Sequence, residues 1–229
     1  MTTKQKIKMQ MKDTINTVWY FPGWMRSRSD HSDNITSLKR AFPDAEVLVK
    51  RWESDSLNFL SARRNADRVA RELATKLENM DQGFLSQLAM VGHSLGGRLV
   101  IKALSLFAQS CPNKKIGAAT VAAAAIRGNS QEIHRAANTL KSELTIISNK
   151  FDPLLALGYR SFVPIGIPIL GTTGIREPQQ GVRQYHIPTT YPLRVHARAP
   201  LMGFAPMRLI CSHLAKFYLE FLADIKTDN

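Results

Sequence analysis

The sequence predicts an α/β fold in which about six mostly parallel strands are flanked by helices. Short runs rich in β-branched and aromatic residues alternate with segments of helical periodicity along the 229 residues, an order typical of a parallel sheet covered by helices. The strand candidates in the middle of the chain also lack alternation between apolar and polar residues. Strands of that kind are expected to be buried on both faces.

The strands are predicted from short apolar runs that end at turn-forming residues. The first run stops at Pro22-Gly23, a pair that terminates strands because it favours turns. The third run continues directly into a glycine-rich turn, and the fourth consists of small residues. In chain order, the predicted strands are Asn16–Phe21, Ala45–Arg51, Leu88–Val91, Ile116–Ala124, Leu144–Ser148 and Gly181–Ile187.

The helices are predicted from helix-forming composition and from capping residues. Asp33 or Asn34 is the expected cap of the first helix, and Pro43 follows its end. The longest helix combines good helix formers with Arg and Glu at i,i+4 spacing, and the last is amphipathic. The predicted helices are Asn34–Ala41, Leu57 to about Met80, one that follows Gly97 and reaches Ala108, Gln131–Leu140 and Leu209–Ile225.

The chain is expected to form one domain over residues 15–229, preceded by a basic tail at residues 1–14. Within the domain, residues 154–175 are apolar but rich in Gly and Pro. We interpret this segment as a lid loop over a substrate site, with plain covering of the core as the alternative. The N-terminus does not have the pattern of a secretory signal peptide. No apolar run approaches the length of roughly 20 residues that a membrane-spanning helix needs. A soluble, cytoplasmic protein is the default expectation.

Charge and cysteine content exclude several classes of protein. Thirty-one Lys and Arg against 18 Asp and Glu give a net charge of +13, which permits contact with nucleic acid, an anionic membrane surface or an acidic substrate. No motif for specific nucleic-acid binding accompanies the charge. Cys111 and Cys211 belong to no CxxC or Cys/His cluster, so no zinc site or disulfide scaffold is expected, although one bridge between them stays open. Motifs for nucleotides, nicotinamide and zinc proteolysis are absent too.

The most informative motif is Gly92-His93-Ser94-Leu95-Gly96-Gly97, which fits Gly-x-Ser-x-Gly between a predicted strand and a predicted helix. Glycines two residues before and two after Ser94 leave room for a tight, strained turn. That turn would present the serine hydroxyl at the N-terminus of the next helix, where free amides and the helix dipole favour negative charge. Ser94 is therefore the candidate nucleophile, and a purely structural turn is the alternative.

On this motif and the order of its elements, the sequence resembles the α/β-hydrolase superfamily over nearly the whole chain, in a minimal form without a separate cap domain. The resemblance implies a serine, acid and histidine in that order. Asp152 stands where the family places its acid, in the loop that leaves the strand Leu144–Ser148. A carboxylate there would orient the histidine and stabilise its charged form. The alternative is that Asp152 only caps a turn before Pro153.

The base is chosen from six histidines: His31, His93, His134, His186, His196 and His213. His213, before the main part of the terminal helix, best matches the family position. If that helix begins at Pro206, a favoured first position, His213 lies mid-helix and His196 inherits the role from its loop. His31 and His134 precede the acid, His93 is expected to pack inside the elbow, and His186 lies within the sixth strand.

The resemblance also implies two backbone donors for an oxyanion. The amide of Leu95 follows the nucleophile, and the second donor is expected from the loop after the first strand, at Trp24. Gly23 would let that loop approach closely, although the family often has His-Gly where this chain has Pro22-Gly23. A Pro-Gly turn that simply ends the strand is the alternative.

These features predict a serine hydrolase that cleaves carboxylic esters, an esterase or lipase, through Ser94, Asp152, His213 and an acyl-enzyme. Neither a metal nor an organic cofactor is expected. The expected partner is a small ester or lipid substrate, and the basic surface is compatible with an anionic membrane. Alternatives are a non-catalytic hydrolase-like binding module, or a basic surface that binds anionic lipid or nucleic acid. Thioesterase, amidase and acyltransferase activities share the fold, and nothing in the sequence indicates an oligomeric state.

Overall fold

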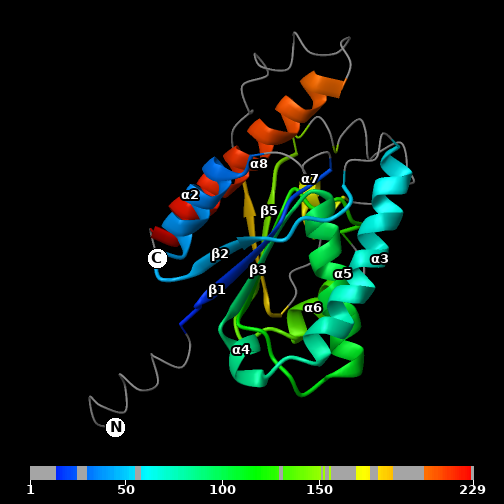
Figure 1. Cartoon of the computed structure of the whole chain (residues 1–229), viewed down its shortest axis with the longest axis vertical. Helices are drawn as coiled ribbons and strands as arrows, with labels where there is room; N and C mark the ends of the chain where they lie inside the picture. The colour runs from blue at the N-terminus through cyan, green and yellow to red at the C-terminus, as the bar shows by residue number, and fades with distance from the viewer. Residues whose placement is uncertain are drawn as a thin grey trace.

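A single sheet of six parallel strands runs through the molecule in the order β2-β1-β3-β4-β5-β6 (Figure 1). The computed structural model describes residues 14–24, 30–54, 58–128, 131–150, 152, 155, 169–175, 180–187 and 204–227, of which 204–214 by their backbone only. The predicted α/β class, with about six mostly parallel strands flanked by helices, is confirmed. The strands are β1 (Thr17–Phe21), β2 (Glu46–Val49), β3 (Leu88–His93), β4 (Ala118–Ala122), β5 (Leu144–Ser148) and β6 (Val182–His186).

Helices cover both faces of the sheet (Figure 1). Helices α2 (Ser32–Ala41) and α8 (Phe204–Thr227) lie against each other on one face. The other face carries α3 (Phe59–Glu78), α5 (Leu95–Ser110) and α6 (Gln131–Asn138), with α5 between the other two. Two short helices, α4 (Gln82–Ser86) and α7 (Leu170–Thr173), complete the described elements.

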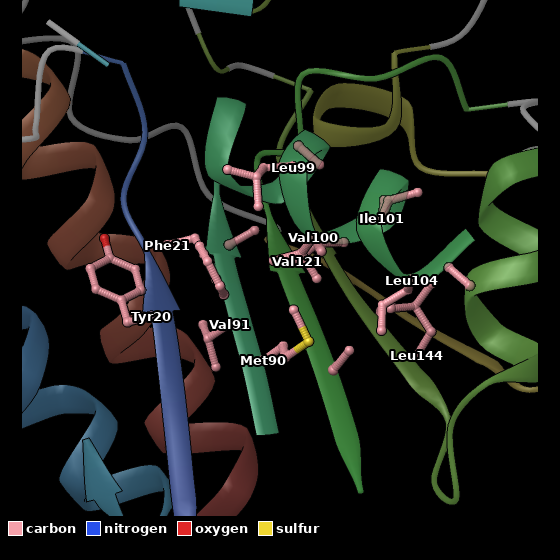
Figure 2. Packing of buried hydrophobic residues seen from close by; sticks show 14 of the residues in the cluster. Tyr20, Phe21, Met90, Val91, Leu99, Val100, Ile101, Leu104, Val121 and Leu144 are labelled. Carbon is pink, nitrogen blue, oxygen red and sulfur yellow. The ribbon is translucent and has the colours of Figure 1, made fainter. Parts of the chain in front are cut away.

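Burial on both sheet faces explains why the strands are apolar without alternation. In β1, the four residues Val18 to Phe21 are all buried, and Tyr20 and Phe21 leave the strand on opposite sides (Figure 2). Met90 and Val121 lie in the layer between the central strands and α5 (Figure 2). Each such side chain contributes about 1.5–3 kcal/mol when it is removed from water.

An ion pair between helices ties the helix of the Ser94 motif to its neighbour. Arg98 on α5 donates from Nε and Nη2 to the two carboxylate oxygens of Asp67 on α3, at 2.8 and 2.9 Å. The Arg98 side chain is only 6% exposed, and Lys102 adds a contact of 3.3 Å to the same carboxylate. This bidentate geometry is the strong form of the Arg–carboxylate interaction, so it holds α5 in a fixed position against α3.

The helices differ from the prediction at several places. Helix α2 begins at Ser32 after His31, so the expected caps Asp33 and Asn34 lie inside its first turn; that prediction was wrong. Helix α4 was not predicted: the Asp81 side chain accepts hydrogen bonds from two amides and caps a five-residue helix that has no apolar periodicity of its own. Helix α7 is a single turn, short enough to form among the glycines of residues 154–175.

Helix α8 begins at Phe204 rather than at Leu209. Pro206 is therefore in its first turn, where a proline is tolerated because its missing N–H would have no partner within the helix. His213 consequently lies within the helix, as its tenth residue. None of the helices that the structure describes is both long and apolar enough to cross a lipid bilayer. The basic tail up to residue 13 and residues 156–168 of the predicted lid lie outside the described residues.

Candidate active site

The motif around Ser94 forms a strained elbow between β3 and α5. Ser94 has φ 53° and ψ −118°, a backbone conformation that residues other than glycine rarely adopt. Its amide donates to the Ala122 carbonyl at 2.9 Å, and its carbonyl accepts from the amides of Arg98 and Ala125, each at 3.1 Å. These bonds to β4 and α5 hold the strained residue in place, and its half-buried side chain stands at the N-terminus of α5.

The glycines of the motif are required by close backbone approach. A Cβ on Gly92 would lie 2.5 Å from the carbonyl oxygen of Gly96, and a Cβ on Gly97 would lie 2.9 Å from the Cβ of Ala124. A Cβ on Gly96 would overlap the carbonyl of Phe21, the last residue of β1. The spacing recognised in the sequence therefore has a steric basis: it lets β1, β3 and α5 converge at Ser94.

The loop after β1 lies directly against the elbow. A Cβ on Gly23 would lie 3.0 Å from the Cβ of Ser94 and 3.1 Å from Nδ1 of His93. Trp52 fixes this loop by donating its indole N–H to the Pro22 carbonyl at 2.8 Å. Trp24 is the next residue of this loop, and its role as an oxyanion donor stays a prediction. Leu95 is the first residue of α5, where amides have no acceptor within the helix.

Asp152 follows β5 and is buried, with 2% of its surface exposed. Its Oδ1 accepts a hydrogen bond from the Leu155 amide at 3.0 Å, and its Oδ2 accepts one from the Tyr218 hydroxyl at 3.0 Å. Only β4 separates β5 from β3 in the sheet, and parallel strands end at the same edge. Asp152 and Ser94 therefore belong to the same edge of the sheet.

Tyr218 on α8 is a residue of this region that the sequence analysis missed. Its side chain is fully buried, and its ring lies against His93, the neighbour of Ser94, with 5.7 Å between ring centroids. Burial, and then the charge and hydrogen bond of Asp152, raise the pKa of Tyr218 well above its ordinary value of 10.0. The phenol therefore remains a donor to the carboxylate at any physiological pH. A tyrosine within an apolar helix gave no signal for this role.

The structure describes the side chains of some of the histidines and not of others. The side chain of His213 and the whole of His196 lie outside the described residues, so the choice of base stays a prediction. His93 is buried inside the elbow, as expected. His134 is exposed on α6, and His31 is buried at the start of α2.

His186 is engaged in a structural contact at the end of β6. Its Nδ1 lies 2.7 Å from Oγ of Ser148, and its Nε2 lies 2.6 Å from the side-chain nitrogen of Gln184. The Gln184 oxygen accepts from the Ile175 amide at 2.8 Å, which fixes the orientation of the side-chain amide. The amide nitrogen can only donate, so Nε2 is the acceptor, and Nδ1 carries the proton that His186 donates to Ser148.

No family model matches the sequence, and no curated protein sequence matches it. Solved structures do resemble it. A proposed cell-surface hydrolase from Lactobacillus plantarum WCFS1 is 15% identical, with 94% of this chain and 98% of that chain covered and a TM-score of 0.48. MGS-M1, an α/β hydrolase from a deep-sea metagenome library of the Medee basin, is 15% identical, with coverages of 95% and 88% and a TM-score of 0.42. An acetylxylan esterase is 12% identical, with coverages of 92% and 98% and a TM-score of 0.42.

These similarities are remote, and the description of the chain rests on its own geometry. The parallel six-stranded order, the strained elbow after β3 and the helix that follows it are geometric features of the α/β-hydrolase fold. The chain has the α/β-hydrolase fold.

Proposed function

We propose that the chain is a serine hydrolase that cleaves carboxylic esters through Ser94, Asp152 and His213. The observation that carries the proposal is the strained conformation of Ser94 at the N-terminus of α5. A backbone held in such a conformation is costly, about 1–3 kcal/mol, and strain of this kind clusters at functional sites. The close approach of Gly23 to the same serine is a second support.

In the proposed reaction, Oγ of Ser94 attacks the ester carbonyl while an imidazole nitrogen of His213 takes the hydroxyl proton. The carbonyl oxygen becomes an oxyanion that accepts hydrogen bonds from the amides of Leu95 and Trp24. The carbon–oxygen bond to the alcohol then breaks, and the imidazolium donates its proton to that alcohol. Water, deprotonated by the same histidine, attacks the acyl-enzyme, which releases the carboxylic acid and restores Ser94.

Asp152 would accept a hydrogen bond from the other imidazole nitrogen and so fix the ring and stabilise its charge. Its burial and its two donors support this role, because they hold the carboxylate in one orientation. The choice of His213 as the base rests on the order serine, acid and histidine along the chain. On helix α8, Tyr218 lies at Asp152, and His213 lies five residues, about 7.5 Å along the axis, nearer the N-terminus. In Figure 1 that end of α8 rises past the carboxyl ends of the strands.

We propose an ester of an apolar acyl group as the substrate, because residues 154–175 are apolar in sequence; the described residues Leu155, Ile169 and Leu170 of this segment are buried in the core. The test is hydrolysis of 4-nitrophenyl acetate, butyrate and octanoate by the full chain. Ser94→Ala should abolish turnover of all three and leave the circular-dichroism spectrum unchanged. Ser142→Ala is the matched control, because Ser142 precedes β5 at the opposite edge of the sheet, and it should keep full activity. Equal activity in both variants would contradict the proposal and favour a non-catalytic binding module.

A further inference from the structure

A second candidate site, which does not include Ser94, lies on the face of the sheet that carries α3. Here a cleft of about 190 Å³ opens between the end of β1, the residues after β2 and one side of α3. Phe21 and Leu73 contribute apolar surface, and Lys50 and Lys76 contribute cations from its two sides. The cleft is smaller than the roughly 300 Å³ at which pockets for drug-sized ligands begin, so it fits one small chemical group.

The two lysines share one indole ring. The Nζ atoms of Lys50 and Lys76 lie 4.4 and 5.5 Å from the centroid of the Trp19 ring, within the distance of a cation–π contact. Burial, and then the charge of Lys76, lower the pKa of Lys50, while Glu46 opposes the shift. The cations are therefore close enough to repel each other, a cost that a bound anion would remove.

Within the described part of the chain neither lysine forms an ion pair, and the attraction of Glu46 for Lys50 is a smaller influence on its pKa than burial and Lys76. Glu72 lines the cleft, but its carboxylate accepts from Arg68 at 2.7 Å on the exposed surface of α3. Arg51 lines the cleft as well. The charge balance of the cleft is positive.

The buried ring beneath the lysines carries an unused donor. Trp19 is 4% exposed, and its indole N–H has no hydrogen-bond acceptor among the described residues. Trp52, in the wall of the same cleft, instead donates its indole N–H to a backbone carbonyl. A buried donor without an acceptor costs about 1–3 kcal/mol, and such groups call for an explanation such as a missing ligand.

We propose that this cleft binds an oxyanion, a carboxylate or a phosphate, carried on a small apolar group. The ammonium groups of Lys50 and Lys76 hold the oxyanion, and the apolar group lies against Phe21 and Leu73. Lysine suits this role because it binds such anions as a mobile point charge. The site is independent of Ser94 and of the proposed hydrolysis.

The test measures binding of octanoate and octyl phosphate to the full chain by isothermal titration calorimetry below their micellar concentrations, with octanol as the neutral comparison. Lys50→Met and Lys76→Met keep an unbranched apolar side chain and remove the charge. Each should weaken binding of both anions about tenfold, the loss of one charge-assisted contact, and Lys→Arg at the same positions should restore it. Lys39→Met is the matched control, because Lys39 is exposed on α2 across the sheet, and should bind as the wild type does.

The indole nitrogen signals locate the ligand. In ¹⁵N-labelled protein, the Trp19 indole resonance should shift on titration with octyl phosphate, while that of Trp24, outside the cleft, should stay. Unchanged affinity in both methionine variants, equal binding of octanol, or an unmoved Trp19 signal would overturn the proposal. So would binding to phosphatidylglycerol vesicles without binding of either monomeric anion, because that result would assign the lysines to a membrane-facing surface instead of a small-ligand cleft.

Discussion

Removal of the Tyr218 hydroxyl should destabilise the protein more than removal of an equally buried hydroxyl elsewhere. Tyr218→Phe deletes the donor that lies 3.0 Å from Oδ2 of Asp152. Tyr20 is the matched control, because it is also fully buried and its hydroxyl has a neutral partner, the Asn34 amide at 3.2 Å. Both variants keep the aromatic ring, so the comparison isolates the partner of the hydroxyl.

The expected magnitudes follow from the charge of the acceptor. A hydrogen bond to a charged group contributes about 1.5–3 kcal/mol net, and one between neutral groups about 0.5–1.5 kcal/mol. Tyr218→Phe should therefore lower the free energy of unfolding by about 2 kcal/mol and Tyr20→Phe by about 1 kcal/mol. In a double-mutant cycle with Asp152→Asn, Tyr218→Phe should show an interaction free energy of at least about 1 kcal/mol, because the two residues are in contact.

The Tyr218 contribution should also depend on pH. Its pKa in the folded protein is raised, by burial first and then by Asp152, so an unfolded chain loses the phenol proton near pH 10 while the folded chain keeps it. The stabilisation is complete below that pH and is lost as the pH rises further. The difference between wild type and Tyr218→Phe should shrink above about pH 10.

The assay is urea unfolding followed by circular dichroism at pH 7, 9 and 10.5, with the free energies taken from linear extrapolation. Equal losses in the two tyrosine variants, a cycle with no interaction energy, or a difference that grows at alkaline pH would refute the reasoning. Because the proposed role of Asp152 depends on its orientation, Tyr218→Phe should also lower kcat for 4-nitrophenyl butyrate, with little change in KM.

Three further predictions concern the elbow, the helix contact and the base. Gly96→Ala should cost about 1–3 kcal/mol and most activity, since its Cβ would overlap a backbone carbonyl of β1; a variant as stable and active as wild type would show that the elbow can relax. Burial alone would raise the pKa of Asp67, but Arg98 and Lys102 lower it below 3.8. Asp67→Asn should therefore destabilise the protein by about 2 kcal/mol at pH 7 and progressively less below pH 4, as measured by urea unfolding. Alanine at His213 should abolish ester hydrolysis and alanine at His196 should spare it, and the reverse result would reassign the base.

The elements that the sequence predicted well are those governed by local chemistry. The run Gly92 to Gly97 specifies a tight turn with glycine at three of its positions. A Cβ on any of these three glycines would collide with atoms that the turn brings close. Strands such as β5 are recognisable because both faces are covered, so buried residues follow one another without a polar residue at every second position. Asp152 was predicted from the family order; it is buried in the loop after β5, and its role as the acid stays a prediction.

What the sequence did not reveal depends on contacts between distant segments. Tyr218 and Asp152 are 66 residues apart, and only the packing of α8 brings the phenol to the carboxylate. The pairing of Lys50 and Lys76 over Trp19 likewise joins three elements. The start of α8 was placed too late, because Gly and Pro near residue 204 resemble a loop although the first turn of a helix tolerates them.

The central claim, that the elbow activates Ser94, is tested most directly by covalent labelling of the full chain with a fluorophosphonate. The labelled protein is digested and the modified residue is located by mass spectrometry, with Ser94→Ala and Asp152→Asn treated alongside. We expect one adduct, on Ser94, none in Ser94→Ala, and labelling slowed at least tenfold in Asp152→Asn because the base loses its orienting carboxylate. A folded wild-type protein that reacts at other serines, or at none, would contradict the claim.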